Sequence, residues 1–192
     1  MIIMSVISAM PKGGIALTRN STKLPDSGDD FVALDLETTG LFPDSNQILA
    51  IAAVRFIDGE PVAPFMRYCR INGELSKQVQ EITGITPEMM SDAVDLGLAL
   101  VELRGFISES PVVIYNADFS MKFLRKAAEA HGFEMTNAIV DVHLLAKEKI
   151  PSLLRYLMRD ILKKLGISAG DEIGVLGGAY DTGKIYRNLK VS

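Results

Sequence analysis

The sequence lacks tryptophan altogether and has one cysteine, Cys69, in 192 residues. A single cysteine excludes an intrachain disulfide framework and a metal site built only from cysteines, and it is typical of an intracellular protein. No hydrophobic run approaches the ~18 residues that a membrane-spanning helix needs, since the longest one extends from Ile48 to Val54. We therefore expect a cytoplasmic protein with no membrane segment.

Positive charge is not in excess either. The chain has 20 Lys and Arg against 24 Asp and Glu, a formal net charge of −4. Tight nonspecific binding to duplex nucleic acid is not expected from this balance. A local basic stripe, or metal ions that bridge to phosphate, could still bind nucleic acid despite the net negative charge. One predicted helix has a charged face, for which solvation or contact with a partner is the default interpretation. This face is formed by Arg155, Arg159, Lys163 and Lys164.

The first 29 residues differ in character from the rest of the chain. Residues 20–30 are rich in Ser, Asp, Pro and Gly and predict a loop or a poorly ordered lead-in. Regular patterning begins at Phe31, and the length suffices for one domain at ~150 residues per domain. We thus expect a flexible lead-in over residues 1–29 and one folded domain over residues 30–192.

Hydrophobic patterns and turn signals predict five strands. The first, Phe-Val-Ala-Leu-Asp-Leu, is a nearly continuous apolar run, typical of a central strand buried on both faces. Asp58-Gly59 is a hairpin signal, so the second and third strands are expected to pair antiparallel. The five strands are expected over residues 31–36, 48–57, 62–71, 111–115 and 138–142.

Helical spacing and capping signals fill the intervals between these strands. Three leading strands followed by alternating strands and helices predict an α/β domain with a mixed five-stranded sheet flanked by helices. Helices are expected over residues 74–82, from Thr86, over 96–107, over 119–130, from about residue 143, over 152–165 and over 177–189.

Two carboxylates, Asp35 and Glu37, stand at the end of the first predicted strand. Residues two apart in a strand point to the same side, and adjacent carboxylates repel unless a cation or protons compensate them. Oxygen ligands of this kind suit Mg²⁺ or Mn²⁺. A solvated acidic turn is the alternative, but the buried strand before the pair and the Thr38-Thr39-Gly40 turn after it favour a metal site.

The segment from Phe31 to Leu41 resembles the first motif of the DnaQ-like 3′–5′ exonucleases of the DEDD superfamily. This family includes the epsilon subunit of DNA polymerase III, ribonuclease T and oligoribonuclease. Residues 112–124 and 178–181 are similar to its second and third motifs, in the same order and spacing. The resemblance covers residues 31–190 and implies a ribonuclease-H-like fold. It also implies phosphodiester hydrolysis with two Mg²⁺ or Mn²⁺ ions, four carboxylates and a histidine that activates the attacking water.

Carried over by position, the resemblance makes Asp35, Glu37 and Asp181 metal ligands, with Asp35 bridging the two ions. Two of the five catalytic positions differ from the family, because Ser120 stands where the second motif has an aspartate and Leu176 where the third has the histidine. Loss of a general base typically costs ~10²–10⁴-fold in rate, and loss of a carboxylate weakens the second ion.

Asp118 is the candidate substitute for the missing aspartate. It could reach the site if the preceding strand extends to it, whereas in a helix its side chain would point away from residue 120 by ~200°. An alternative is that Asp118 caps a helix beginning near Phe119.

The resemblance also implies that the protein binds the 3′ end of single-stranded DNA or RNA without sequence preference. No tail of the kind that tethers an epsilon subunit to its polymerase follows the last predicted helix, so a homodimer is expected, as in ribonuclease T-like members. The residues expected to contact the terminal nucleotides are Thr38, Thr39, Gly40, Leu41, Asn116 and Phe119.

Three functions are compatible with these residues. The favoured one is an exonuclease-like domain with a degenerate site, which binds 3′ ends and hydrolyses them slowly or not at all. The second is an active exonuclease in which Asp118 replaces the missing carboxylate. The third is a non-catalytic interaction module that uses the same fold to bind a partner.

Overall fold

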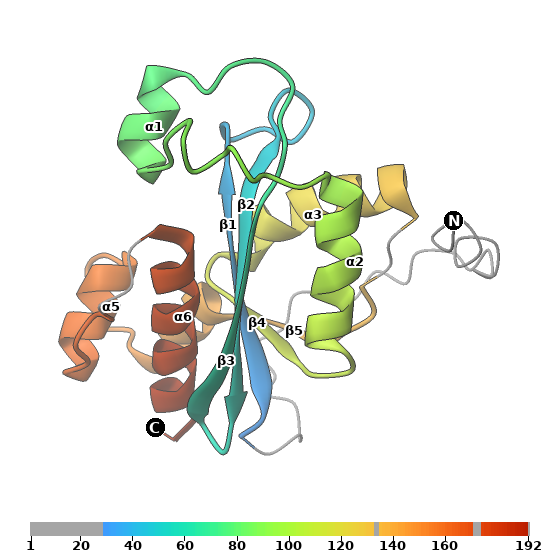
Figure 1. The fold of residues 1–192 in the computed structure, drawn as a ribbon. Coiled ribbons are helices and arrows are strands. Elements are labelled where there is room, and N and C mark those ends of the chain that lie inside the picture. Colours follow the sequence, from blue (N-terminus) through green and yellow to red (C-terminus); the bar gives the residue numbers. More distant parts are fainter. Residues whose placement is uncertain (1–28, 133–134, 171–173, 192) are drawn as a thin grey trace.

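A five-stranded mixed sheet forms the centre of the computed structural model, which describes residues 29–132, 135–170 and 174–191 (Figure 1). The strand order is β3-β2-β1-β4-β5, with β1, β2 and β3 antiparallel and β1, β4 and β5 parallel. The predicted α/β class and mixed sheet are confirmed. The lead-in predicted over residues 1–29 lies outside the described residues apart from Asp29. The strands are β1 (Phe31–Thr38), β2 (Ile48–Ile57), β3 (Glu60–Tyr68), β4 (Val112–Ile114) and β5 (Ile139–Asp141).

Helices cover both faces of the sheet. In the described part of the chain they are α1 (Lys77–Thr83), α2 (Leu96–Ile107), α3 (Ala117–His131), α4 (Val142–Lys149), α5 (Met158–Leu165) and α6 (Gly174–Val191). One hydrophobic cluster joins the sheet to α2 and α3, and another joins it to α4, α5 and α6. Helix α1 lies beyond the end of β1 (Figure 1). None of the described helices is long and apolar enough to cross a membrane.

Strand β1 is buried on both faces, as its apolar run predicts. Ala33 belongs to the cluster on the α6 side, whereas Val32 and Leu34 belong to the cluster under α2 and α3. The hairpin between β2 and β3 is also confirmed. Asp58 and Gly59 both have positive φ angles, 52° and 75°, which is the backbone that a two-residue type I′ hairpin requires.

Helix α6 approaches the sheet closely because two of its inward positions are glycine. A Cβ atom at Gly183 would overlap the ring of Phe56. That ring stacks on Phe31 with centroids 4.7 Å apart, and Phe31 meets Tyr186 of α6 edge-on at the same distance. The glycine therefore lets the helix backbone rest directly on an aromatic cluster of the sheet.

One predicted helix, the one from Thr86, is wrong, and another, predicted over residues 152–165, begins only at Met158; in each case tertiary contacts explain the difference. The segment after Thr86 forms turns, because the chain must return to pair Val94 with Cys69 beside β3. Residues 152–157 do not continue α5, since the Tyr156 hydroxyl donates to the Ile150 carbonyl at 2.8 Å and Tyr115 donates to the carbonyl of Tyr156. These bonds hold the segment in an irregular path.

Helix α3 begins at Ala117, two residues earlier than predicted. The buried carboxylate of Asp141 accepts a hydrogen bond from the Ala117 N–H at 2.9 Å and fixes the first turn there. The N-cap is Asn116, in a left-handed conformation, so the prediction that Asp118 caps the helix is wrong.

We expect Gly183→Ala to destabilise the fold by about 1–3 kcal/mol, because the added methyl group would have to displace the Phe56 ring from a packed core. Denaturant unfolding followed by circular dichroism measures the effect. Gly105→Ala on α2 is the matched control. Nothing lies within 4 Å of a Cβ at Gly105, so this exchange should stabilise the protein by up to about 1 kcal/mol. Equal effects of the two variants would contradict the close docking of α6.

Candidate active site

Asp35 and Glu37 lie at the end of β1 on the side of the sheet that α6 covers. They alternate with Leu34 and Leu36, which are buried toward α2 and α3. On the neighbouring strand β2 their register partners are Ala52 and Ala50. Because alanine offers only a methyl group, strand β2 supplies no cation or hydrogen-bond donor side chain to either carboxylate at these positions.

The carboxylate of Asp35 is pressed against helix α6. A Cβ atom at Gly178 would overlap its Oδ2 atom, while Oδ1 accepts a hydrogen bond from the Leu36 N–H at 2.9 Å. Burial raises the pKa of Asp35 to about 7, the Leu36 hydrogen bond opposes this shift, and the charge of Glu37 adds to it. Burial also raises the pKa of Glu37 to about 7. A bound cation would relieve this unfavourable burial of two carboxylates.

Asp181 lies on α6 one helical turn after Gly178. Its Oδ1 atom accepts a hydrogen bond from the Gly170 N–H at 3.0 Å and lies 3.7 Å from the Lys184 ammonium. The fold therefore brings Asp181 onto the same helix that touches Asp35. Within the described ranges, however, no three His, Cys, Asp or Glu side chains are gathered closely enough to hold a metal ion as the site stands.

The second motif straddles the start of α3. The side chain of Asp118 is 67% exposed and forms an ion pair with Lys122 at 2.6 Å. Ser120, two residues further along the helix, is only 2% exposed. Ser120 thus faces the interior of the protein, whereas Asp118 lies in solvent.

Leu176 is partly buried against the hydrophobic cluster on the α6 side of the sheet. Neither histidine lies on α6. His131 is exposed at the end of α3, next to Gly97 of α2. His143 is on α4, with its ring centroid 5.5 Å from that of Tyr115 and 6.1 Å from that of Tyr156, and burial lowers its pKa.

The turn after β1 is closed by Asn46. A Cβ atom at Gly40 would overlap the Asn46 side chain, and the Thr39 hydroxyl donates to Asn46 Oδ1 at 3.3 Å. Thr38 donates to the Gly40 carbonyl at 2.7 Å. Leu41 follows this turn and is 72% exposed.

The two remaining residues of the expected substrate contact lie at the start of α3. Asn116 is exposed, and its side chain makes no capping hydrogen bond to the helix. Phe119 is partly buried, with its ring centroid 5.2 Å from that of Phe123.

Sequence reasoning missed two residues that shape this region, Asp141 and Gly178. Besides the Ala117 N–H, the Asp141 carboxylate accepts hydrogen bonds from the N–H groups of His143 and Leu144, so it joins the starts of α3 and α4. An aspartate directly between a strand and a helix is a capping signal that could have revealed this role. Gly178 gives no local signal, because its importance comes from a strand that is distant in sequence.

Residues 32–171 match the RNase T family model, whose description is "exonuclease". The chain belongs to this exonuclease family. It is 29% identical over 191 residues to the PolC-type DNA polymerase III of Halalkalibacterium halodurans, covering 98% of this chain and 13% of that protein. It is 32% identical over 157 residues to the corresponding Thermotoga petrophila polymerase, covering 81% of the chain and 11% of the polymerase. The chain thus spans about an eighth of these relatives.

Solved exonuclease structures share the fold. A structure of exonuclease I superposes with a TM-score of 0.72 at 17% identity, covering 84% of this chain and 41% of that one. Exonuclease X in complex with 5′ overhanging duplex DNA superposes with a TM-score of 0.67 at 24% identity, covering 84% and 91%. At these identities the likeness establishes the architecture, and the chemistry depends on the residues present.

We expect the melting temperature of the protein in EDTA to fall by several degrees between about pH 4 and pH 7. In the folded state Asp35 and Glu37 keep their protons up to a pKa of about 7, whereas the ordinary values are 3.8 and 4.5. Stability is therefore present at low pH and is lost as the pH rises through the folded pKa. Asp35→Asn should flatten this slope. Asp58→Asn, a change at an exposed turn position where asparagine tolerates the positive φ angle, should keep it. An unchanged slope in Asp35→Asn would contradict the burial of this carboxyl group.

Proposed function

We propose that this chain is a DnaQ-like domain that binds the 3′ end of single-stranded nucleic acid and hydrolyses it weakly or not at all. The observation that carries the proposal is the contact of partly buried Asp35 with α6, the helix on which Leu176 replaces the family's histidine. A hydrocarbon side chain cannot accept a proton, so the helix docks as in an exonuclease without supplying a base.

Asp35, Glu37 and Asp181 are the residues that would hold Mg²⁺ or Mn²⁺. Their carboxylate oxygens suit these ions, and the raised pKa values of Asp35 and Glu37 indicate a place that lacks a compensating charge. When bound, such an ion would polarise the scissile phosphate. Ser120 contributes no charge where the family has a carboxylate, and Lys184 lies beside Asp181, so we expect weak binding of one ion or two.

The turn after β1 and the start of α3 are the proposed contact surface for the terminal nucleotides. Exposed Leu41 offers an apolar surface to a base or sugar, and Asn116 has a side chain free of capping bonds. Exonuclease I of E. coli has been solved in complex with a dT13 oligonucleotide, at a TM-score of 0.71 with this chain, and this supports single strands as the ligand. DNA and RNA are both compatible with these contacts.

Asp118 is a poor substitute for the missing carboxylate. Its exposed position and its ion pair with Lys122 point it away from the interior, where Ser120 lies. This geometry favours the degenerate site over a fully active exonuclease.

We expect at most slow shortening of a 5′-labelled single strand in Mn²⁺, with the residual activity abolished by Asp35→Ala. The informative variant is Leu176→His, alone and with Ser120→Asp, which restores groups that the family uses. Restoring a base is expected to raise the rate by ~10²–10⁴-fold. Denaturing gels resolve the products.

Asp118→Asn is the control in that experiment and should leave every rate unchanged. Rapid cleavage by the unaltered protein that is lost in Asp118→Asn would contradict the degenerate site and support Asp118 as the substitute carboxylate.

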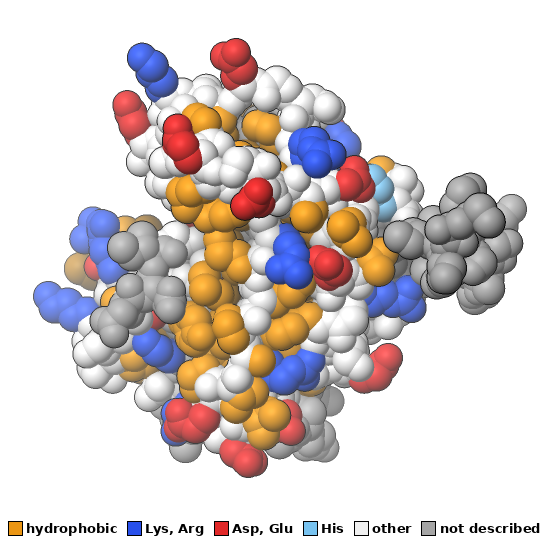
Figure 2. Space-filling view, viewed as in Figure 1, with side chains coloured by type: hydrophobic (Ala, Val, Ile, Leu, Met, Phe, Trp, Pro, Cys, Tyr) orange, Lys and Arg blue, Asp and Glu red, His pale blue; other side chains and the backbone are white. Residues whose placement is uncertain are grey.

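A second candidate function, an interaction module that pairs with a second copy, is favoured by one observation. Strand β3 is an edge strand, and Val62 on it is 52% exposed. Figure 2 shows hydrophobic side chains in a band over this strand. Pro61 and Pro64 remove two backbone donors from the edge, so side chains rather than a continued sheet would make the contact.

Light scattering coupled to size exclusion tests the module. A homodimer that dissociates in Val62→Glu, but not in Val101→Glu on α2, would support pairing through β3. A monomer at all concentrations would exclude it.

A further inference from the structure

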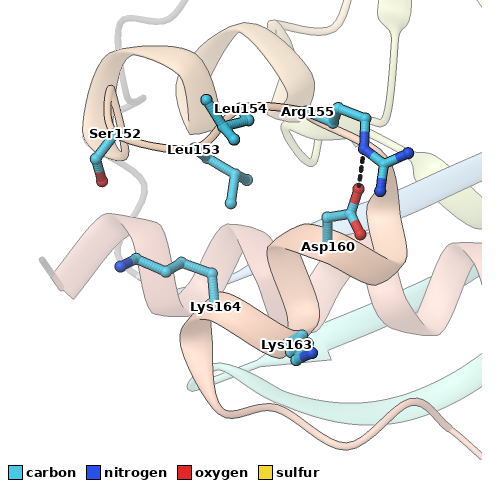
Figure 3. Close-up of a pocket in the computed structure, with 7 residues that line it drawn as sticks. All are labelled: Ser152, Leu153, Leu154, Arg155, Asp160, Lys163 and Lys164. Carbon is cyan, nitrogen blue, oxygen red and sulfur yellow. Dashed lines mark ion pairs between the residues drawn. The ribbon is translucent and has the colours of Figure 1, made fainter.

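A groove of about 480 Å³ lies between the irregular segment 152–155 and helix α5. Figure 3 shows Leu153 and Leu154 on one wall and Lys164 on the other, with Arg155 and Asp160 at one end. This volume suits a ligand the size of a nucleotide. The groove lies outside the residues assigned above to the terminal nucleotides.

The groove is the centre of a positive region in an otherwise acidic protein. Residues 147–164 carry six Lys and Arg against two carboxylates, while the whole chain has a net charge of −4. Figure 2 shows Lys and Arg side chains gathered where α5 lies, at the left of the view. These six cations are Lys147, Lys149, Arg155, Arg159, Lys163 and Lys164.

Of the cations that line the groove, only Arg155 has an ion pair with a residue that the structure describes. Arg155 Nε lies 3.7 Å from Asp160 Oδ2, a long ion pair. Lys163 and Lys164 are exposed and form no ion pair with any residue that the structure describes. Both lysines line the groove, so their charges favour an anion bound within it.

The groove also presents an apolar surface to solvent. Leu154, which lines the groove, is a large hydrophobic side chain and yet is 98% exposed. Cations beside exposed apolar surface are what a single strand requires, because its bases are unpaired and its phosphates are charged. A free phosphate would use only the cations.

The position of the groove connects it to the proposed site. Helix α5 packs against α6, and the loop that leaves α5 donates the Gly170 N–H to Asp181. An eight-residue helix is ~12 Å long, so α5 spans several nucleotides of backbone at most. The groove is therefore built on the helix that packs next to the one carrying Asp181.

We propose that this groove binds the phosphate backbone of the single strand some nucleotides away from its 3′ end. The proposal rests on the proposed function, because the end of the strand must occupy the carboxylate site. Lys163 and Lys164 supply the charge, and Leu154 contacts the bases or sugars.

Fluorescence anisotropy with oligothymidylates of about 4 and about 16 nucleotides, across a salt series, tests the groove. Lys163→Gln/Lys164→Gln should weaken binding of the longer strand by about tenfold at 0.1 M salt. For the longer strand, the slope of log affinity against log salt concentration should become shallower by about 0.7 for each phosphate that the variant no longer neutralises. The shorter strand should bind the variant and the unaltered protein equally well. Arg104→Gln, exposed on α2 on the other side of the sheet, is the single-charge control and should match the unaltered protein.

Each outcome decides between the two proposals. The groove proposal is overturned, and the proposed function stands, if the short strand binds and the long strand binds no more tightly than the short one. The same holds if the short strand binds and the lysine variant has the same affinity for the long strand as the unaltered protein. If the long strand binds through the lysines and the short strand does not bind, the groove binds single strands but the proposed function fails, and the placement of the groove relative to a bound 3′ end fails with it. Competition by inorganic phosphate at low millimolar concentration, or lysine-dependent binding of a poly-glutamate peptide in place of the long strand, would overturn the groove in favour of a free anion or an acidic protein.

Discussion

The contact between helix α6 and strand β1 determines most of what this protein can do. It forms because Gly178 and Gly183 let the helix backbone approach the strand and its aromatic neighbours without a side chain between them. The same contact partly shields Asp35 from water, raises its pKa, and places Asp181 one helical turn after Gly178 on the covering helix. The contact that packs this part of the core is therefore also the contact that raises the pKa of a candidate site residue.

Much of this arrangement could be predicted from sequence, because it depends on local patterns. The apolar run of β1 and the Asp58-Gly59 turn led directly to the observed strands and hairpin. The start of α3 could not be predicted in this way, since a carboxylate 24 residues distant fixes it. The irregular path of residues 152–157 likewise depends on tyrosine hydroxyls and carbonyls that meet only in the folded chain.

The carboxylates themselves were found from sequence, but their environment was not. Asp35 and Glu37 stand out because two acidic residues follow an apolar strand. The partial burial of Asp35 depends on Gly178, and the exposure of Asp118 depends on where α3 begins. Sequence can thus name candidate ligands, whereas the distinction between a compensated and an uncompensated charge requires the neighbouring elements.

Asp141 stabilises the backbone around the second motif without using the side chain at position 120. Its three backbone hydrogen bonds hold the first turns of α3 and α4 whatever side chain occupies position 120. Exchange of an acidic group for serine at that position therefore leaves the surrounding loops in place. A scaffold braced in this way keeps the shape of its loops independently of the side chain that the chemistry would use.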